Sequence, residues 1–187
     1  MATSQIRGSG VNGLIPYGGW VPSVHPTVFV AHGAWIIGNV EIGEQSSVWF
    51  NTVIRGDVHS IRIGARTNIQ DNSTLHVTSG QYALSVGAGV TVGHRAVLHG
   101  CVIEDDCLIG MGAIVLDGAV VRRGSLVAAG SVVPEGYEVP EGMLVAGVPS
   151  KVKRALTEGE RKAINETAFH YVDYGKTYLS KQGEGIT

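Results

Sequence analysis

The sequence has few aromatic residues, no excess of basic charge and no long apolar run. Lys and Arg number 14 against 16 Asp and Glu, and the formal net charge is −2. The chain therefore lacks the basic surface that nucleic-acid binding requires. No stretch approaches the roughly eighteen consecutive apolar residues of a membrane-spanning helix. We expect neither a nucleic acid nor a membrane among its partners.

Cysteine is also scarce, with Cys101 and Cys107 alone in 187 residues. Two thiols in a chain of this length are typical of a reduced protein rather than a disulfide scaffold. We interpret both as small buried residues. The segment Met1–Gly13 has one basic residue and no apolar run, so it does not have the pattern of a signal peptide. Together these features predict a cytoplasmic location.

Glycine, by contrast, is abundant. It accounts for 27 of 187 residues, roughly twice its usual share of about 7%. Apolar residues make up 44% of the chain, which is more than a disordered segment would carry. The composition predicts a folded domain with many tight turns.

Branched aliphatic residues recur every six positions in the second half of the chain. The run is Ile103, Ile109, Val115, Val121, Val127 and Val133. A helix repeats about every 3.6 residues and a hairpin strand about every two, so neither produces this period. A β-sandwich of short strands has no reason to keep one frame over so many steps. The period predicts a hexapeptide β-helix, with three short strands in each coil.

The same six-residue spacing recurs upstream, with extra residues at two places. Ile54 to Ile63 is three residues longer than one unit, and Leu75 to Val86 is five residues longer. We expect these extra residues to form loops at corners of the coil, near Val58–Ser60 and Val77–Gln81.

These patterns divide the chain into three parts. Residues 1–21 form an extended lead-in, 22–150 the β-helix, and 151–187 a C-terminal helix that packs on it. Thr157 and Glu160 have the spacing of a capping box at the start of that helix. Its predicted apolar face contains Ile164, Ala168, Tyr171, Tyr174 and Tyr178.

Three of the seven histidines are related by the frame. His76 and His99 are 23 residues apart, which is one coil of eighteen plus the five surplus residues. They should stack at one corner of adjacent coils, about 4.8 Å apart. Two imidazoles at that separation can share a metal ion. Arg55 should lie one coil before them in the same column.

His94 lies five residues before His99, on the preceding face. Within one chain it should not reach a metal held by the other two histidines. In a cyclic trimer the neighbouring chain can supply it. Three neutral imidazoles with an open fourth position are the ligand set of catalytic zinc.

The combined motifs resemble the γ-class carbonic anhydrase family, and within it the small bacterial branch. The matching segments are Arg55-Gly56-Asp57, Asn68-Ile69-Gln70-Asp71, Leu75-His76, Val92-Gly93-His94 and Leu98-His99-Gly100-Cys101. The resemblance runs from about Pro22 to the C-terminal helix. It implies a homotrimer of left-handed parallel β-helices, each with a C-terminal α-helix.

The resemblance also implies a metal site at each subunit interface. His76, His94 and His99 match the family's ligands for Zn²⁺, and Fe²⁺ or Co²⁺ suits the same ligand set. Arg55 and Asp57 match a pair that bridges subunits.

The implied reaction is that of a lyase, the reversible hydration of CO₂ to bicarbonate by metal-bound hydroxide. Gln70 matches the residue that hydrogen-bonds the metal-bound water, and Asn68 and Asp71 match its polar neighbours. Tyr171 matches a tyrosine that the C-terminal helix brings to the site. We therefore expect Gln70 and Tyr171 to be the catalytic side chains.

One departure from the family affects the expected rate. Founding members carry glutamates that pass the proton to solvent, whereas here the first such position is Val58 and the loop Val77–Gln81 has no carboxylate. Turnover needs a proton relay, so weak hydration is expected. Two other functions remain open, a non-catalytic metal-stabilised trimeric scaffold and a CoA-dependent hexapeptide acyltransferase.

Overall fold

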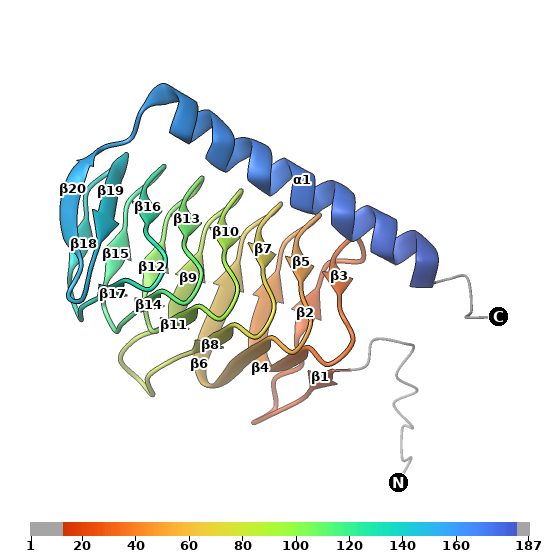
Figure 1. Cartoon of the computed structure of the whole chain (residues 1–187). Coiled ribbons are helices and arrows are strands. Elements are labelled where there is room, and N and C mark those ends of the chain that lie inside the picture. The colour runs from red at the N-terminus through yellow and green to blue at the C-terminus, as the bar shows by residue number, and fades with distance from the viewer. Residues whose placement is uncertain (1–12, 183–187) are drawn as a thin grey trace, which may run out of the picture.

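The computed structural model describes residues 13–182 and shows a parallel β-solenoid followed by one long helix (Figure 1). The helix, α1, spans Glu158–Gln182. The strands are β1 Leu14–Ile15, β2 Ser23–Val24, β3 Phe29–Val30, β4 Trp35–Ile42, β5 Ser47–Val48, β6 Val53–Ile63, β7 Asn68–Ile69, β8 Thr74–His76, β9 Leu84–Val86, β10 Thr91–Val92, β11 Val97–His99, β12 Val102–Ile103, β13 Leu108–Ile109, β14 Ile114–Val115, β15 Val120–Val121, β16 Leu126–Val127, β17 Val132–Val133, β18 Glu138–Val139, β19 Met143–Ala146 and β20 Lys151–Ala155.

Each short strand pairs in parallel with its equivalent one coil away. Ile109 of β13 lies beside Val92 of β10 and Val127 of β16, so the six-residue frame sets the register. Strands β3, β5, β7, β10, β13, β16 and β19 form one face in that order. The left-handed parallel β-helix that the sequence predicts is confirmed.

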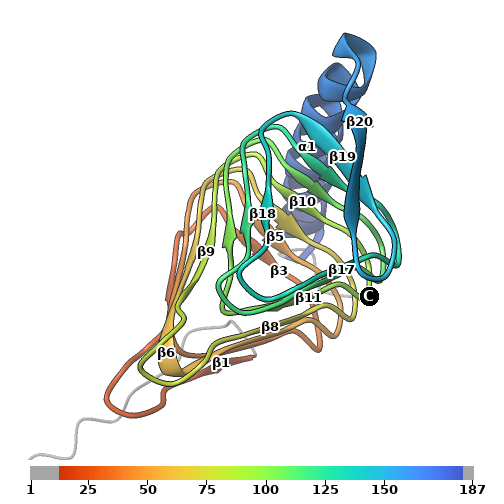
Figure 2. The ribbon, with the colours of Figure 1, turned by 90° about the vertical axis from the view of Figure 1, so that its left-hand side faces the viewer.

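The coils enclose a three-sided core, which Figure 2 shows nearly end-on. We name the corners by the coil that contains the histidines. The first corner, 93–96, follows β10; the second corner, 99–101, begins at the last residue of β11; and the third corner, 104–107, follows β12. The face between the first and second corners contains β8, β11, β14 and β17.

One aliphatic side chain from each strand fills the interior. Ile54, Leu75, Leu98 and Val115 are fully buried at equivalent positions of successive coils. Where coils approach most closely, only glycine fits, because a Cβ on Gly110 would come within 2.4 Å of the Ala129 backbone nitrogen.

Both cysteines are free and buried, as the sequence predicts. Burial raises the pKa of the Cys107 thiol to about 12 and raises that of Cys101 further. Both thiols therefore stay protonated and unreactive at neutral pH.

The first predicted loop is wrong in detail. Residues 58–60 belong to β6, which continues as a strand from Val53 to Ile63. The register against β4 shifts between Gly38 and Val40, so four residues of β6 lie opposite Asn39. The surplus is absorbed as a bulge inside a paired strand, because β4 continues alongside it. The second loop is a tight turn closed by a bridge between Thr78 and Tyr82.

Helix α1 runs along the outside of β3, β5, β7 and β10 (Figure 1). The predicted capping box is present, because Thr157 N donates to Glu160 Oε2 at 2.8 Å and Glu160 N donates to Thr157 Oγ1 at 3.2 Å. Ile164 and Ala168 are buried as predicted, and Val172 continues the buried stripe.

Two tyrosines depart from the predicted helix face. Tyr174 and Tyr178 are 53% and 42% exposed. Gly175 takes the buried position, where its backbone allows close approach to Phe29. Spacing alone did not distinguish these positions because they are adjacent on the helix. Tyr178 instead lies over Phe29, with ring centroids 5.0 Å apart.

The ends of the β-helix also differ from the predicted divisions. Leu14 and Ile15, placed in the lead-in, already form a strand that pairs with β4. Lys151–Ala155, placed with the helix, form β20, which pairs antiparallel with β19. Residues 1–12 of the predicted lead-in lie outside the described residues, as do 183–187. Within 13–182, no helix combines the length and apolarity needed to cross a membrane.

Removing the helix cap should loosen the first turn of α1. Thr157→Ala leaves the amide of Glu160 without its side-chain acceptor, a cost of about 1 kcal/mol. Hydrogen exchange over the first turn should then be about fivefold faster. The matched control is Thr177→Ala, where the hydroxyl bonds only to the Asp173 carbonyl within the helix. Equal exchange in wild type and Thr157→Ala would contradict the cap.

Candidate metal centre

His76 and His99 lie side by side at the second corner. They end β8 and β11, and their backbones pair in register. The His76 Nδ1 and His99 Nε2 atoms are 3.0 Å apart. The frame therefore brings these two imidazoles together, as the sequence spacing predicts.

The outer nitrogen of each ring is held by a carboxylate. His76 Nε2 lies 3.1 Å from Asp57 Oδ1, and His99 Nδ1 lies 2.7 Å from Asp117 Oδ1. Arg55 donates to the other oxygen of Asp57. Carboxylates accept hydrogen bonds, so each neutral ring carries its proton on the outer nitrogen.

The consequence is that the two inner nitrogens, His76 Nδ1 and His99 Nε2, both present lone pairs. Two lone pairs 3.0 Å apart repel each other unless a proton or a metal cation lies between them. Nitrogens about 3.3 Å apart span one edge of a tetrahedral zinc site with Zn–N bonds of about 2.05 Å. The pair therefore fits a shared metal ion.

The protonation state of His76 also favours metal binding. Burial lowers the pKa of His76, and although its hydrogen bond to Asp57 acts in the opposite direction, the pKa stays below the ordinary value. The ring is thus neutral at neutral pH, the form that binds metals. Burial raises the pKa of Asp57, but hydrogen bonds from Arg55 and His76 outweigh it and hold that pKa below its usual range.

Asp117 is a functional candidate that the sequence reasoning missed. Its carboxylate accepts hydrogen bonds from His99 and from Thr78 Oγ1, the latter at 2.6 Å. These bonds keep its pKa below the ordinary value although burial raises it. The available signal was its position eighteen residues after His99, which is one uninterrupted coil. We call Arg55, Asp57, His76, His99 and Asp117 the two-histidine cluster.

A second group of polar side chains includes the third histidine, at the first corner. His94 Nδ1 lies 2.7 Å from Asp71 Oδ2, one coil away. Gln70 Nε2 donates to Asn68 Oδ1 at 3.1 Å, and Asn68 Nδ2 donates to Thr91 Oγ1 at 2.9 Å. Gln70 is 6% exposed, and its amide oxygen remains available as an acceptor. We call Asn68, Gln70, Asp71 and His94 the His94 cluster.

Tyr171 of α1 lies on the same side as the His94 cluster. Its ring packs edge-on against Trp49, with centroids 5.3 Å apart. Burial raises the pKa of the Tyr171 phenol, and the negative charge of Asp71 adds to this effect. The phenol is therefore protonated at neutral pH and can donate a hydrogen bond.

The two clusters occupy opposite ends of one face. His94 precedes β11 and His99 ends it, so up to about 16 Å of extended chain separates them. Within residues 13–182, no group of three or more His, Cys, Asp or Glu side chains is placed to hold a metal. One chain thus brings together two of the three predicted ligands and leaves His94 apart from them.

Comparison with known proteins supports both the repeat and the motifs. The family model described as bacterial transferase hexapeptide (six repeats) matches residues 100–135. A solved structure of a hexapeptide transferase family protein from Anaplasma phagocytophilum superimposes with a TM-score of 0.84 at 43% identity, covering 89% of this chain and 98% of that one.

Curated relatives carry a more specific name. A protein of Methanocaldococcus jannaschii named "Probable carbonic anhydrase" is 55% identical over 84% of this chain and 98% of its own length. The mitochondrial gamma carbonic anhydrase 2 of Arabidopsis thaliana is 44% identical over 88% of this chain, which spans 61% of that longer protein. The chain belongs to the γ-class carbonic anhydrase family of hexapeptide-repeat proteins.

Proposed function

We propose that this protein is a metal-dependent carbonic anhydrase that hydrates CO₂ reversibly to bicarbonate. The observation that carries the proposal is the pair of inner nitrogens, His76 Nδ1 and His99 Nε2, which face each other at 3.0 Å. The names of the curated relatives support the choice of reaction. Zn²⁺ is the proposed metal, and Fe²⁺ or Co²⁺ suits the same nitrogen ligands.

The site is proposed to form between subunits of a homotrimer. In this arrangement the two-histidine cluster of one subunit meets the His94 cluster of the next, which supplies the third imidazole. Each subunit contributes both clusters, so the trimer contains three equivalent sites, one at each interface. Arg55 and Asp57 are then placed to contact the neighbouring subunit as well as His76.

If zinc is held by these three histidines, it would supply hydroxide at neutral pH, because it would lower the pKa of a bound water to about 7. Asp57 and Asp117 fix the protonated nitrogens of His76 and His99, which keeps the inner lone pairs available. Gln70 Nε2 donates to Asn68 Oδ1, which leaves the Gln70 amide oxygen free to accept a hydrogen bond from the nucleophile and orient it. Tyr171 is proposed to donate a hydrogen bond at the same site.

Subunit mixing tests whether the site is shared. We expect about one metal ion per chain in the wild-type trimer, as in other three-imidazole sites, and loss of metal in both His94→Ala and His76→Ala. When the two variants are unfolded together and refolded, mixed trimers contain an intact site and metal binding should return. Elemental analysis measures the metal content per chain, and light scattering measures the mass of the assembly.

Two controls make this result specific. Mixing His76→Ala with His99→Ala should not restore metal, because both variants damage the same cluster. His170→Ala, an exposed histidine on α1, should bind metal as the wild type does. A wild-type protein that remains metal-free after refolding with Zn²⁺ would overturn the proposal. Binding of acetyl-CoA in calorimetry would point instead to acyl transfer.

The carboxylate of Asp117 should strengthen metal binding through His99. Asp117→Asn keeps the shape but removes the charge that fixes the ring, so metal affinity should fall about 10- to 100-fold. Competition with a chromophoric chelator measures the change. Asp105→Asn is the matched control, because Asp105 pairs with Arg123 at another corner. Equal losses in the two variants would rule out this role.

Proton transfer should limit turnover in this chain. Val58 is 44% exposed and no carboxylate lies in the turn that follows His76, so CO₂ hydration should be slow and should rise with imidazole buffer concentration. Val58→Glu should raise the buffer-independent rate at least about tenfold. Val148→Glu, at an exposed turn, serves as control. Rapid hydration in dilute buffer by the wild type would contradict this expectation.

A further inference from the structure

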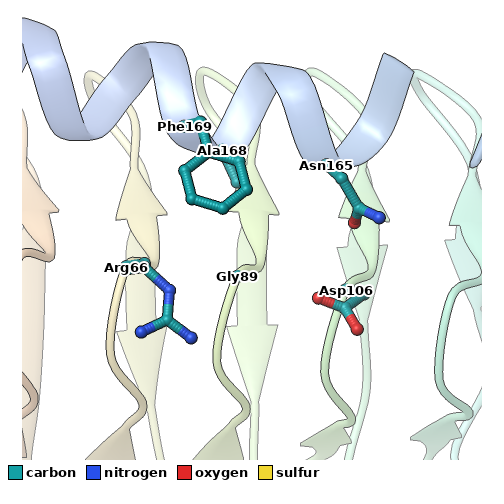
Figure 3. A pocket seen from close by; sticks show the side chains of 6 residues that line it. All are labelled: Arg66, Gly89, Asp106, Asn165, Ala168 and Phe169. Carbon is teal, nitrogen blue, oxygen red and sulfur yellow. The ribbon is translucent and has the colours of Figure 1, made fainter. Parts of the chain in front are cut away.

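A pocket of about 130 Å³ lies between α1 and the third corner of the β-helix. Figure 3 shows the side chains that line it, Arg66, Asp106, Asn165, Ala168 and Phe169, together with Gly89. The first and second corners hold the His94 and two-histidine clusters. The pocket is therefore separate from the proposed metal site.

The opening arises from one glycine in a column. Arg66, Gly89 and Asp106 occupy the same position in successive coils, with φ of 53°, 66° and 57°. Backbone hydrogen bonds from Gly89 N to Ala65 O and from Asp106 N to Ala88 O fix this register. Because Gly89 has no side chain, a gap remains between Arg66 and Asp106. A Cβ at Gly89 would lie only 2.8 Å from Asp106 Oδ1.

The charged groups that border this gap have no partners within residues 13–182. Neither the Arg66 guanidinium nor the Asp106 carboxylate forms an ion pair or a side-chain hydrogen bond there. At the same corner, by contrast, Arg123 pairs with Asp105. The backbones of Arg66 and Asp106 are two coils apart, about 9.6 Å along the axis, and Asp106 Oδ1 lies near Gly89 between them, so both charged groups border the same small pocket.

The helix supplies the remaining wall. Figure 3 shows the Phe169 ring above the gap between Arg66 and Asp106, and the Asn165 amide above Asp106. Ala168 is buried, whereas Phe169 is 60% exposed although it is a large apolar side chain. An exposed ring beside two unpaired charges of opposite sign offers an apolar surface next to both a cation and an anion site.

We propose that this pocket binds a compact zwitterion of the α-amino acid class. The ligand carboxylate pairs with the guanidinium of Arg66, which matches it in geometry. The ammonium group binds the Asp106 carboxylate and the Asn165 amide oxygen, and a small side chain packs on Phe169. The pocket size limits the ligand to one whose two charges are a few ångströms apart.

Ligand-detected NMR titration of the full-length protein tests this site with L-valine as the probe. Two analogues each lack one charge: 3-methylbutanoate has no ammonium group and isobutylamine has no carboxylate. We expect valine to bind with a Kd of about 1 mM, as befits so small a ligand, and each analogue to bind at least about tenfold more weakly. Equal binding of 3-methylbutanoate would overturn the zwitterion assignment, and absence of valine binding would overturn the site.

Surface variants locate the binding. Arg66→Gln, Asp106→Asn and Phe169→Ala should each weaken valine binding at least about tenfold. The controls remove the same charges from the exposed Lys162–Glu166 pair of α1, as Lys162→Gln and Glu166→Gln, and should leave binding unchanged. Thermal unfolding of every variant verifies that the fold is intact. Unchanged affinity in folded Arg66→Gln and Asp106→Asn would exclude this pocket.

Discussion

The parallel hydrogen bonding between equivalent strands of successive coils fixes everything else in this structure. Because each strand pairs with the strand one coil away, residues one repeat apart must stack in columns. The pairing of His76 with His99 follows from this register, as does the position of Asp117 on the next coil. Surplus residues such as the turn closed by Thr78 and Tyr82 are accommodated because the strands that flank them keep their pairing.

The same rigidity explains why the candidate metal centre is divided. A column can bring together only residues at one corner, and the side chains of His76 and His99 lie partly exposed outside the core there. His94 lies at the other end of the face that His99 terminates. The paired strand between them keeps His94 away from the other two histidines of the same chain. A ligand set completed by another subunit is the natural solution for such a scaffold.

Polar side chains, not the backbone, set the chemistry within each cluster. Asp57 and Asp117 direct the lone pairs of His76 and His99 toward each other, and Asn68 fixes the amide of Gln70. The contacts of Asp57 and Asp117 connect residues on neighbouring coils, whereas Asn68 and Gln70 lie two residues apart in the same coil. Residues also stack in a column at the third corner. There the stacking leaves a gap, because Gly89 has no side chain to fill it.

Much of the fold could be predicted because a strict period has few structural explanations. The six-residue frame predicted the β-helix, and the spacing of Thr157 and Glu160 predicted the start of α1. The bulge in β6 could not be predicted, because its form depends on β4 lying alongside. The buried face of α1 was only partly predicted, since Tyr174, Gly175 and Tyr178 are neighbours on the helix and their burial depends on where Phe29 lies.

By itself, the sequence determined which residues share a column, since column membership needs only residue counting along the repeat. It thereby determined that His76 and His99 meet. Only the tertiary structure decided how those side chains are held. The orientation of an imidazole depends on the hydrogen bonds that it donates to other coils, here to Asp57 and Asp117. The pocket beside α1 was likewise decided by tertiary packing, because it exists only where the helix lies alongside the column that contains Gly89.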